Sequence, residues 1–140
     1  MPQPITRNII NDDLSGRMTG TSTVLNSPIA ANAETIIAQL TLPNFGDTAI
    51  TAGVRLQGWA AFTVGTSGVS ATLRIRQTNV SGSVLVTSGA MTVVAANLYS
   101  FSVLGADAAP GVATYCLTLQ IGSGAANTTI SAVHLSQIMI

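Results

Sequence analysis

Apolar and polar residues alternate along most of this chain with a period of two. Successive side chains of a β-strand point to opposite faces of a sheet, so this period predicts strands rather than helices. No amphipathic helical pattern of useful length interrupts the alternation, and we therefore expect an all-β protein. The alternation is clearest over 113–121, with Tyr115, Leu117, Leu119 and Ile121 on one face and Cys116, Thr118 and Gln120 on the other.

Clusters of Gly, Ser, Asn and Pro divide the alternating stretches into short segments. These turn signals recur at intervals of about 8–14 residues, which is typical of an antiparallel sandwich or barrel. The segment 90–95 fits a strand or a loop equally well. The other strands are expected at Thr21–Asn26, Glu34–Leu42, Gly53–Val64, Val69–Gln77, Val84–Thr87, Leu98–Leu104, Ala113–Ile121 and Thr128–Ile140.

The last segment carries large apolar residues on both of its faces. One face holds Ile130, Ala132, His134, Ser136, Ile138 and Ile140, and the other holds Val133, Leu135 and Met139. A strand that is apolar on both sides is typical of the centre of a sheet, with both faces covered. We therefore expect this strand to be central, and its end to pack into a core or an interface.

The first residues of the chain differ from the rest in composition. Pro2 and Pro4 resist both helix and strand pairing, and no helical period runs through 1–17. The stretch fits either a loosely attached terminus or an extended arm. We divide the chain into an N-terminal arm, residues 1–20, and one β-sandwich domain, residues 21–140.

The chain is poor in charge. Charged residues make up 7% of the sequence, against about a quarter in a typical soluble domain, and lysine is absent. Hydrophobic residues make up 47%, the mean hydropathy is +0.51, and Asp107 is the only formally charged side chain between 78 and 140. A membrane, other protein subunits or neutral polar side chains are three ways to cover such a surface.

The sequence argues against a membrane and against nucleic acid as partners. Its purely apolar runs are about four residues long, whereas a membrane-spanning helix needs about 20, and no signal-peptide pattern is expected at the N-terminus. The net charge is zero and Arg74 and Arg76 form the only close basic pair, so no basic surface for nucleic acid is expected. Neutral polar side chains and other subunits are left to cover the surface.

The sequence offers no catalytic or metal-binding constellation. His134 and Cys116 are the only residues of their types and lie in different segments, so neither a metal site nor a cysteine–histidine pair is expected. Asp12 and Asp13 are adjacent, and neighbouring strand residues point to opposite faces, so a working carboxylate pair is not expected either. We expect no enzyme, no cofactor, no metal and an inert, buried Cys116.

One aromatic pair allows a binding interpretation. Trp59 and Phe62 lie three positions apart in an aliphatic segment. They could form a platform on which a sugar ring stacks, or both rings could pack in the core. Core packing is the favoured interpretation.

The second half of the chain has a recognisable order of segments. A Trp-bearing segment, 54–59, is followed by the Arg-alternating 71–76, by 111–120 with the pattern Gly-x-x-x-Tyr-x-Leu-x-Leu, by the turn 122–124 and by the closing strand 129–140. This order resembles the jelly-roll modules that tailed bacteriophages use on their virions, which are similar to trimeric TNF/C1q-like heads. The resemblance implies a single antiparallel β-sandwich of jelly-roll type with an extended N-terminal arm. It also implies assembly into homo-oligomers, trimers rather than dimers.

Two uses of such a module remain open. A capsid decoration (cement) protein lies on the outer surface of a phage head and bridges major capsid subunits, whereas a fibre head follows a long stalk and binds a receptor. Only the short stretch 1–20 precedes the first expected strand, which favours decoration. A secreted adhesion or carbohydrate-binding module is a further alternative.

The expected contacts follow from the apolar residues. In the decoration interpretation the arm reaches the major capsid protein through Ile5, Arg7, Ile9, Ile10 and Leu14. Copies of the chain are expected to meet through apolar strand faces that exceed the needs of one small core. The residues expected in that interface are Tyr115, Leu117, Leu119, His134, Ile138 and Ile140. The expected location is the outer surface of a virion.

Overall fold

The computed structural model describes residues 18–41, 53–107, 114–122 and 128–139. The regular structure in these ranges is β-strand, and no helix there is long and apolar enough to cross a membrane. The strands are β1 (Met18–Thr21), β2 (Glu34–Thr41), β3 (Val54–Thr63), β4 (Val69–Gln77), β5 (Val84–Thr87), β6 (Met91–Val93), β7 (Leu98–Asp107), β8 (Thr114–Ile121) and β9 (Thr129–Met139). The prediction of an all-β protein is confirmed.

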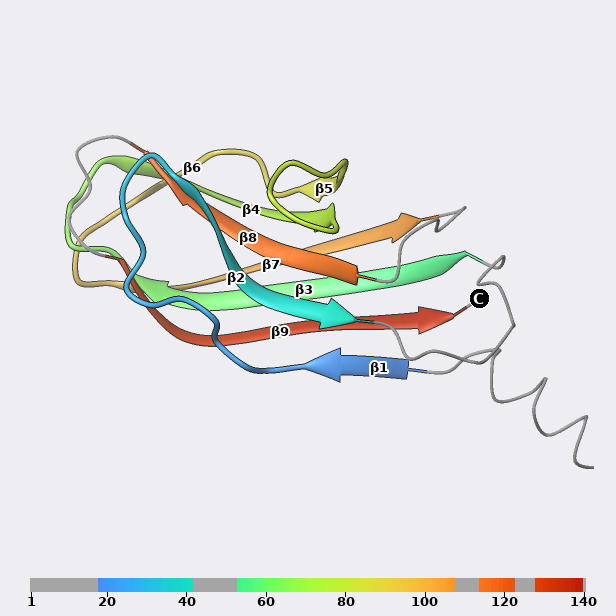
Figure 1. Cartoon of the computed structure of the whole chain (residues 1–140). Helices are drawn as coiled ribbons and strands as arrows, with labels where there is room; N and C mark the ends of the chain where they lie inside the picture. Colours follow the sequence, from blue (N-terminus) through green and yellow to red (C-terminus); the bar gives the residue numbers. More distant parts are fainter. Residues whose placement is uncertain (1–17, 42–52, 108–113, 123–127, 140) are drawn as a thin grey trace, which may run out of the picture.

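The strands form two antiparallel sheets stacked as a sandwich (Figure 1). One sheet has the order β1-β9-β3-β7; the other has the order β2-β8-β4-β5, with β6 also paired to β4. Between β1 and β9 the chain changes sheet at every step except from β4 through β5 to β6. A four-stranded and a five-stranded layer that exchange strands in this way are a jelly-roll-like arrangement, as the resemblance implied.

The core lies between the two sheets and is built by the period-two pattern. In β3 the inward residues are Val54, Leu56, Ala60 and Phe62, and in β8 they are Tyr115, Leu117, Leu119 and Ile121, each almost or fully buried. Phe101 of β7 packs edge-on against Phe62, with ring centroids 5.1 Å apart. The alternation expected for 113–121 is present in β8, and the face that carries Tyr115, Leu117, Leu119 and Ile121 is the one directed into the core.

Gly58 brings β3 close to the opposite sheet. It occupies an inward position between two apolar neighbours, Leu56 and Ala60. A Cβ atom added there would lie 2.7 Å from Cδ1 of Leu117 and 3.4 Å from Cδ1 of Ile75. Glycine fits this position without disturbance, because the side chain of Leu117 on the facing sheet would have to shift to admit a Cβ.

The first strand lies earlier than predicted. The sequence indicated Thr21–Asn26, whereas β1 spans Met18–Thr21 and pairs with β9. The following residues run beside β2 but make only isolated bonds to it, from the Leu25 amide to the Ile37 carbonyl and from the Asn26 side chain to the Ile36 carbonyl. A Thr-rich stretch has strand propensity on both sides of Thr21, and pairing with β9 selects the earlier half.

A β-bulge changes the predicted faces of the last strand. Ala61 pairs with Ala132, but the next residue of β3, Phe62, pairs with Ile130, so Ser131 is the extra residue. The bulge moves Ile130 to the inward face, together with Val133 and Leu135. The predicted face of Ile130 was therefore wrong, while the central position of β9, between β1 and β3, is as predicted.

Candidate functional site

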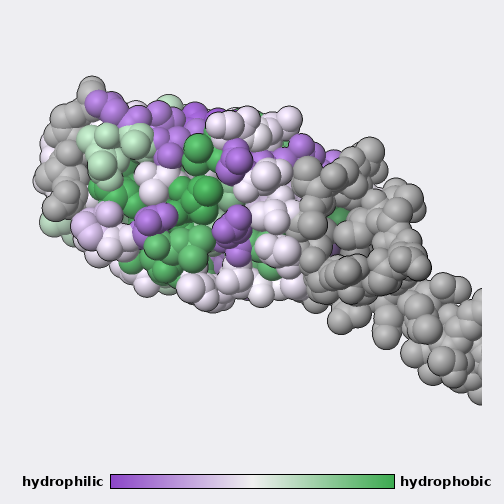
Figure 2. Space-filling view, viewed as in Figure 1, coloured by the Kyte–Doolittle hydropathy of each residue, from purple (hydrophilic) through white to green (hydrophobic). Residues whose placement is uncertain are grey.

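The surface of the described residues carries few charges and several large apolar side chains. In the view of Figure 1, apolar residues gather over the middle of the sandwich with polar residues around them (Figure 2). The exposed large apolar residues are Leu25, Val80, Val84, Met91, Val94, Leu98 and Leu104. The charged residues of the described ranges are Glu34, Arg55, Arg74, Arg76 and Asp107. Their positions distinguish the two outer faces of the sandwich.

The outer face of the β2-β8-β4 sheet is covered by an ionic network. Oε1 of Glu34 accepts hydrogen bonds from Nη1 of Arg74 (3.0 Å) and Nη2 of Arg76 (2.8 Å). Oε2 of Glu34 accepts from Nε of Arg76 (2.5 Å) and from the hydroxyl of Thr118 (2.6 Å). Arg74 also donates to the side-chain oxygen of Gln120 at 2.9 Å. Three strands are thus tied together on their solvent side.

This network sets the protonation of the groups beneath and within it. Burial alone would raise the pKa of Glu34, but hydrogen bonds from Arg76 and Thr118 and the charges of Arg76 and Arg74 outweigh it and lower the pKa below its ordinary 4.5. Cys116 lies fully buried on the same strand face. Burial, and then the charge of Glu34, raises the pKa of the Cys116 thiol to about 11. Cys116 is buried as predicted, and its raised pKa disfavours the reactive thiolate.

The buried acid Asp107 also has a structural role. Its Oδ2 accepts hydrogen bonds from the hydroxyl of Tyr115 (3.0 Å) and from the side-chain amide of Gln77 (2.8 Å). Within the described ranges, no three His, Cys, Asp or Glu side chains lie close enough together to hold a metal ion. The acids of the two sheets therefore serve to connect strands.

The outer face of the β1-β9-β3-β7 sheet has a different character, and we call it the neutral face. It consists of the outward residues of three strands: alternate positions of β3 from Arg55 to Thr63, of β7 from Leu98 to Ala106, and of β9 from Ala132 to Ile138. Arg55 is the only charged residue among them. Leu98 and Leu104, 66% and 73% exposed, are the most exposed large apolar residues of the described ranges, and both lie on this face.

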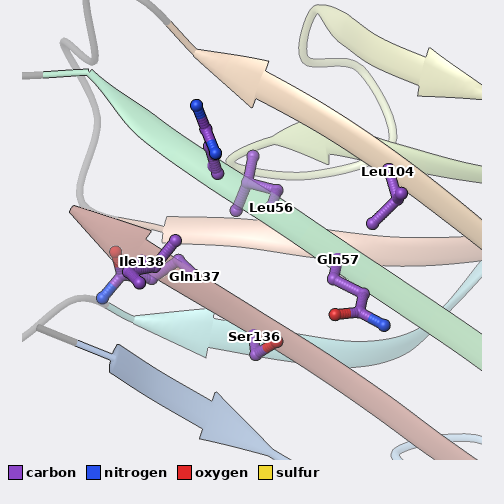
Figure 3. A pocket seen from close by; sticks show the side chains of 7 residues that line it. Leu56, Gln57, Leu104, Ser136, Gln137 and Ile138 are labelled. Atoms are coloured by element: carbon purple, nitrogen blue, oxygen red, sulfur yellow. The ribbon is translucent and has the colours of Figure 1, made fainter. Parts of the chain in front are cut away.

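A shallow depression of about 180 Å³ lies within the neutral face (Figure 3). Gln57 of β3 stands between Leu104 of β7 and Ser136 of β9 in one cross-strand row. The residues that line the depression are Arg55, Leu56, Gln57, Leu104, Ser136, Gln137 and Ile138. Gln137 is almost fully buried beside it, and neither polar atom of its amide has a hydrogen-bond partner. The depression is small, open and mainly apolar, which does not suit an enclosed active site.

Trp59 lies on the neutral face and not in the core. It is half-buried and stands between Ser102 of β7 and His134 of β9, whose Nδ1 hydrogen-bonds the hydroxyl of Ser22 at 3.1 Å. Phe62 is fully buried on the opposite side of β3. Core packing of Trp59 and a joint platform with Phe62 were therefore both wrong, because residues three apart in a strand point to opposite faces.

The residues predicted to join subunits fall into three groups. Tyr115, Leu117 and Leu119 are fully buried between the sheets, so they form the core of one subunit and offer no surface to another. His134 and Ile138 lie half-buried on the neutral face. Residue Ile140 and the arm residues Ile5, Arg7, Ile9, Ile10 and Leu14 lie outside the described residues.

Sequence reasoning missed the most exposed part of the neutral face. Leu98 and Leu104 delimit one of the predicted strands but were not proposed as contacts. A signal was present: they alternate with the aromatic residues Tyr99 and Phe101, and the bulkier ring face is the better candidate for the core. The leucines on the opposite side of the strand, Leu98 and Leu104, are then left on the surface.

Comparisons with known proteins support the fold alone. No family model matches the chain, and no curated protein matches it either. A solved structure of T=1 particles derived from infectious bursal virus is 11% identical with a TM-score of 0.62, covering 89% of this chain and 32% of that chain. A structure of infectious bursal disease virus, strain Gt, is 8% identical with a TM-score of 0.61 and the same coverage. The chain thus spans about a third of the viral chains it matches.

Proposed function

We propose that this chain is a non-enzymatic structural subunit of a bacteriophage virion that assembles with copies of itself. Within that class we propose a capsid decoration protein, which lies on the outside of the head and bridges major capsid subunits. The observation that carries the proposal is the neutral face: a broad sheet surface with one charged residue, Arg55, and two leucines more than half exposed. The cores of protein–protein contacts are depleted of charge in the same way.

The fold supports the proposal without deciding it. Jelly-roll sandwiches are frequent among viral capsid domains, and the solved structures similar to this chain include virus particles. A fold hosts many functions, so the surface of the sandwich and the contacts of its polar residues are the stronger support. Glu34, Asp107 and Cys116 are engaged in holding strands together or are buried, which favours a structural role.

The proposed partners are a second copy of the chain and the major capsid protein. We favour a trimer over a dimer and expect the first 17 residues to reach the capsid as an arm. The test is a purified particle: mass spectrometry and immunogold labelling should find the protein on the head surface. Absence from the particles would overturn the virion proposal.

The arm has its own test. Deletion of residues 1–17 should weaken attachment to the capsid and leave the oligomer of the free protein unchanged. The first strand, β1, begins at Met18, so the deletion leaves the described sandwich complete. Unchanged attachment would exclude a bridging role for the arm.

A carbohydrate-binding role is the second candidate, and the position of Trp59 favours it. The indole is half-buried on an outer sheet face, next to Ser102 and His134, which can hydrogen-bond a sugar. A glycan array comparing the wild type with Trp59→Ala tests this role. Binding that is lost with Trp59→Ala would favour a receptor-binding head or a carbohydrate-binding module over decoration.

A further inference from the structure

We propose that the neutral face is the surface on which a second copy of this chain docks. The inference rests on the proposed function, because it requires a subunit that assembles with itself. It goes further in naming one sheet, β1-β9-β3-β7, as the contact surface. It also replaces the buried Tyr115, Leu117 and Leu119 with the exposed residues Leu98 and Leu104 as the contacts.

The contrast between the two outer faces selects the sheet. On the β2-β8-β4 face, Glu34 joins Arg74 and Arg76, and this network already covers the strand beneath it. A partner docking there would have to remove water from three charged groups, which costs free energy that their pairing only partly returns. The neutral face has a single charge, at Arg55, so a partner desolvates mainly apolar and neutral polar groups.

The position of that charge fits an interface rim. Arg55 is the second residue of β3, close to one end of the strand, and is exposed. Trp59 lies in the middle of the same strand, between β7 and β9. Interfaces place apolar and aromatic residues at the centre and charged residues at the edge, where water still reaches them.

The size of the neutral face fits a stable contact between two copies. At about 3.3 Å per residue, the ten residues of β3 are about 33 Å long, and neighbouring strands lie about 4.8 Å apart. The face therefore projects to about 500 Å², and the relief of its side chains raises the accessible area towards the ~800 Å² that each partner gives to a standard interface. A small ligand needs far less contact area.

Two further properties favour a second copy of this chain over an unrelated partner. The net charge of the sequence is zero, so copies do not repel one another at neutral pH. The face also offers both sides of a contact: Leu104 projects from β7, and the shallow depression beside it, lined by Ile138 and Leu56, can receive an apolar side chain from another copy. In a closed ring such as a trimer, every subunit gives one side of the contact to each neighbour.

The experiment compares the accessibility of one position on each outer face. Ser102→Cys places a thiol beside Trp59 on the neutral face, and Gln39→Cys places one on an exposed position of β2 as the matched control. The native Cys116 is fully buried and does not compete for a maleimide probe under native conditions. In the oligomer we expect the thiol of Ser102→Cys to be protected and that of Gln39→Cys to react at the rate of a free thiol.

A charge placed on each face provides the second measurement. Leu104→Glu should shift the mass in light scattering from the oligomer to the 14.2 kDa monomer and expose the thiol of Ser102→Cys. The control Val84→Glu, at an exposed apolar residue of β5 in the other sheet, should leave the oligomer unchanged. Circular dichroism verifies folding, and if Leu104→Glu misfolds, thiol protection in the otherwise unchanged protein decides.

Three results would overturn the inference. If Ser102→Cys reacts as fast as Gln39→Cys in an oligomer, the copies meet elsewhere, while the virion proposal stands on its separate particle test. If the thiol is protected only on particles and the free chain is a monomer, the capsid protein covers the face. If the free chain is a monomer and the thiol of Ser102→Cys is accessible even on particles, nothing covers the neutral face.

Discussion

The hydroxyl of Tyr115 donates a hydrogen bond of 3.0 Å to Oδ2 of Asp107, and this bond joins the two sheets of the sandwich. Asp107 ends β7 in one sheet, and Tyr115 belongs to β8 in the other. Gln77, at the end of β4, donates to the same carboxylate oxygen at 2.8 Å. The one charged residue of a long neutral stretch is thus used to hold the sheets together at one end.

Tyr115→Phe should lower the free energy of unfolding by about 1–3 kcal/mol, because it removes a buried bond to a carboxylate without removing the ring. Urea unfolding measures the loss. Tyr99→Phe is the matched control, because its hydroxyl accepts from the amide of Val94 at an exposed site, where water can replace it. Equal losses in the two variants would contradict the assignment of a sheet-joining role to Tyr115.

Gly58→Ala should lower the free energy of unfolding by about 1–3 kcal/mol, the usual cost of overfilling a packed core. The added methyl group would lie 2.7 Å from Cδ1 of Leu117. Leu117→Val removes that Cδ1 atom. The double variant Gly58→Ala, Leu117→Val should therefore lose less free energy of unfolding than the two single variants lose in sum. Strict additivity in thermal or urea unfolding would show that the two positions do not touch.

Glu34→Gln should destabilise the protein at pH 7 and make its stability less dependent on pH in the acid range. The folded-state pKa of Glu34 lies below its ordinary 4.5, so its contribution is present above pH 4.5 and is lost as the pH falls through the folded value. The wild type and the variant should therefore converge in stability at low pH. A constant difference in unfolding free energy across the acid range would contradict this.

Cys116 should react with a thiol reagent only after unfolding. Its side chain is fully buried, and its pKa is raised to about 11, so at pH 8 little thiolate exists and none is accessible. Ellman's reagent should give almost no colour with the native protein and one thiol per chain in guanidinium chloride. Rapid reaction of the native protein would mean that β8 opens under native conditions.

The oligomer should persist in about 1 M NaCl, because exposed ion pairs are screened by salt whereas apolar contacts are not. The neutral face contributes one charged residue, Arg55, so few ion pairs are available to be lost. Light scattering across a salt series provides the measurement. Dissociation by NaCl alone would show that charged residues hold the copies together.

Local pattern predicted the strands well, and non-local pairing explains the errors. The alternation at 98–104 and 115–121 correctly grouped the residues that share a face, since side-chain direction within a strand depends only on neighbouring residues. Ile130 was misplaced because the bulge at Ser131 arises from the pairing of β9 with β3. Trp59 was misplaced because the prediction followed its hydrophobicity. Its position two residues after the polar Gln57 puts it on the same strand face as Gln57, which is the outer face.

The sequence by itself determined the all-β class, most of the strand positions and the lack of charge, and its resemblance to jelly-roll modules indicated the arrangement of the strands. Only the tertiary structure decided which side of each strand is buried between the sheets and which remains on the surface. It placed Tyr115, Leu117 and Leu119 inside one subunit and left Leu98, Leu104 and Trp59 outside. The physical reason is that a period of two defines two faces of a strand, but only the stacking of one sheet on another, through pairings between residues far apart in the chain, selects the face that loses contact with water.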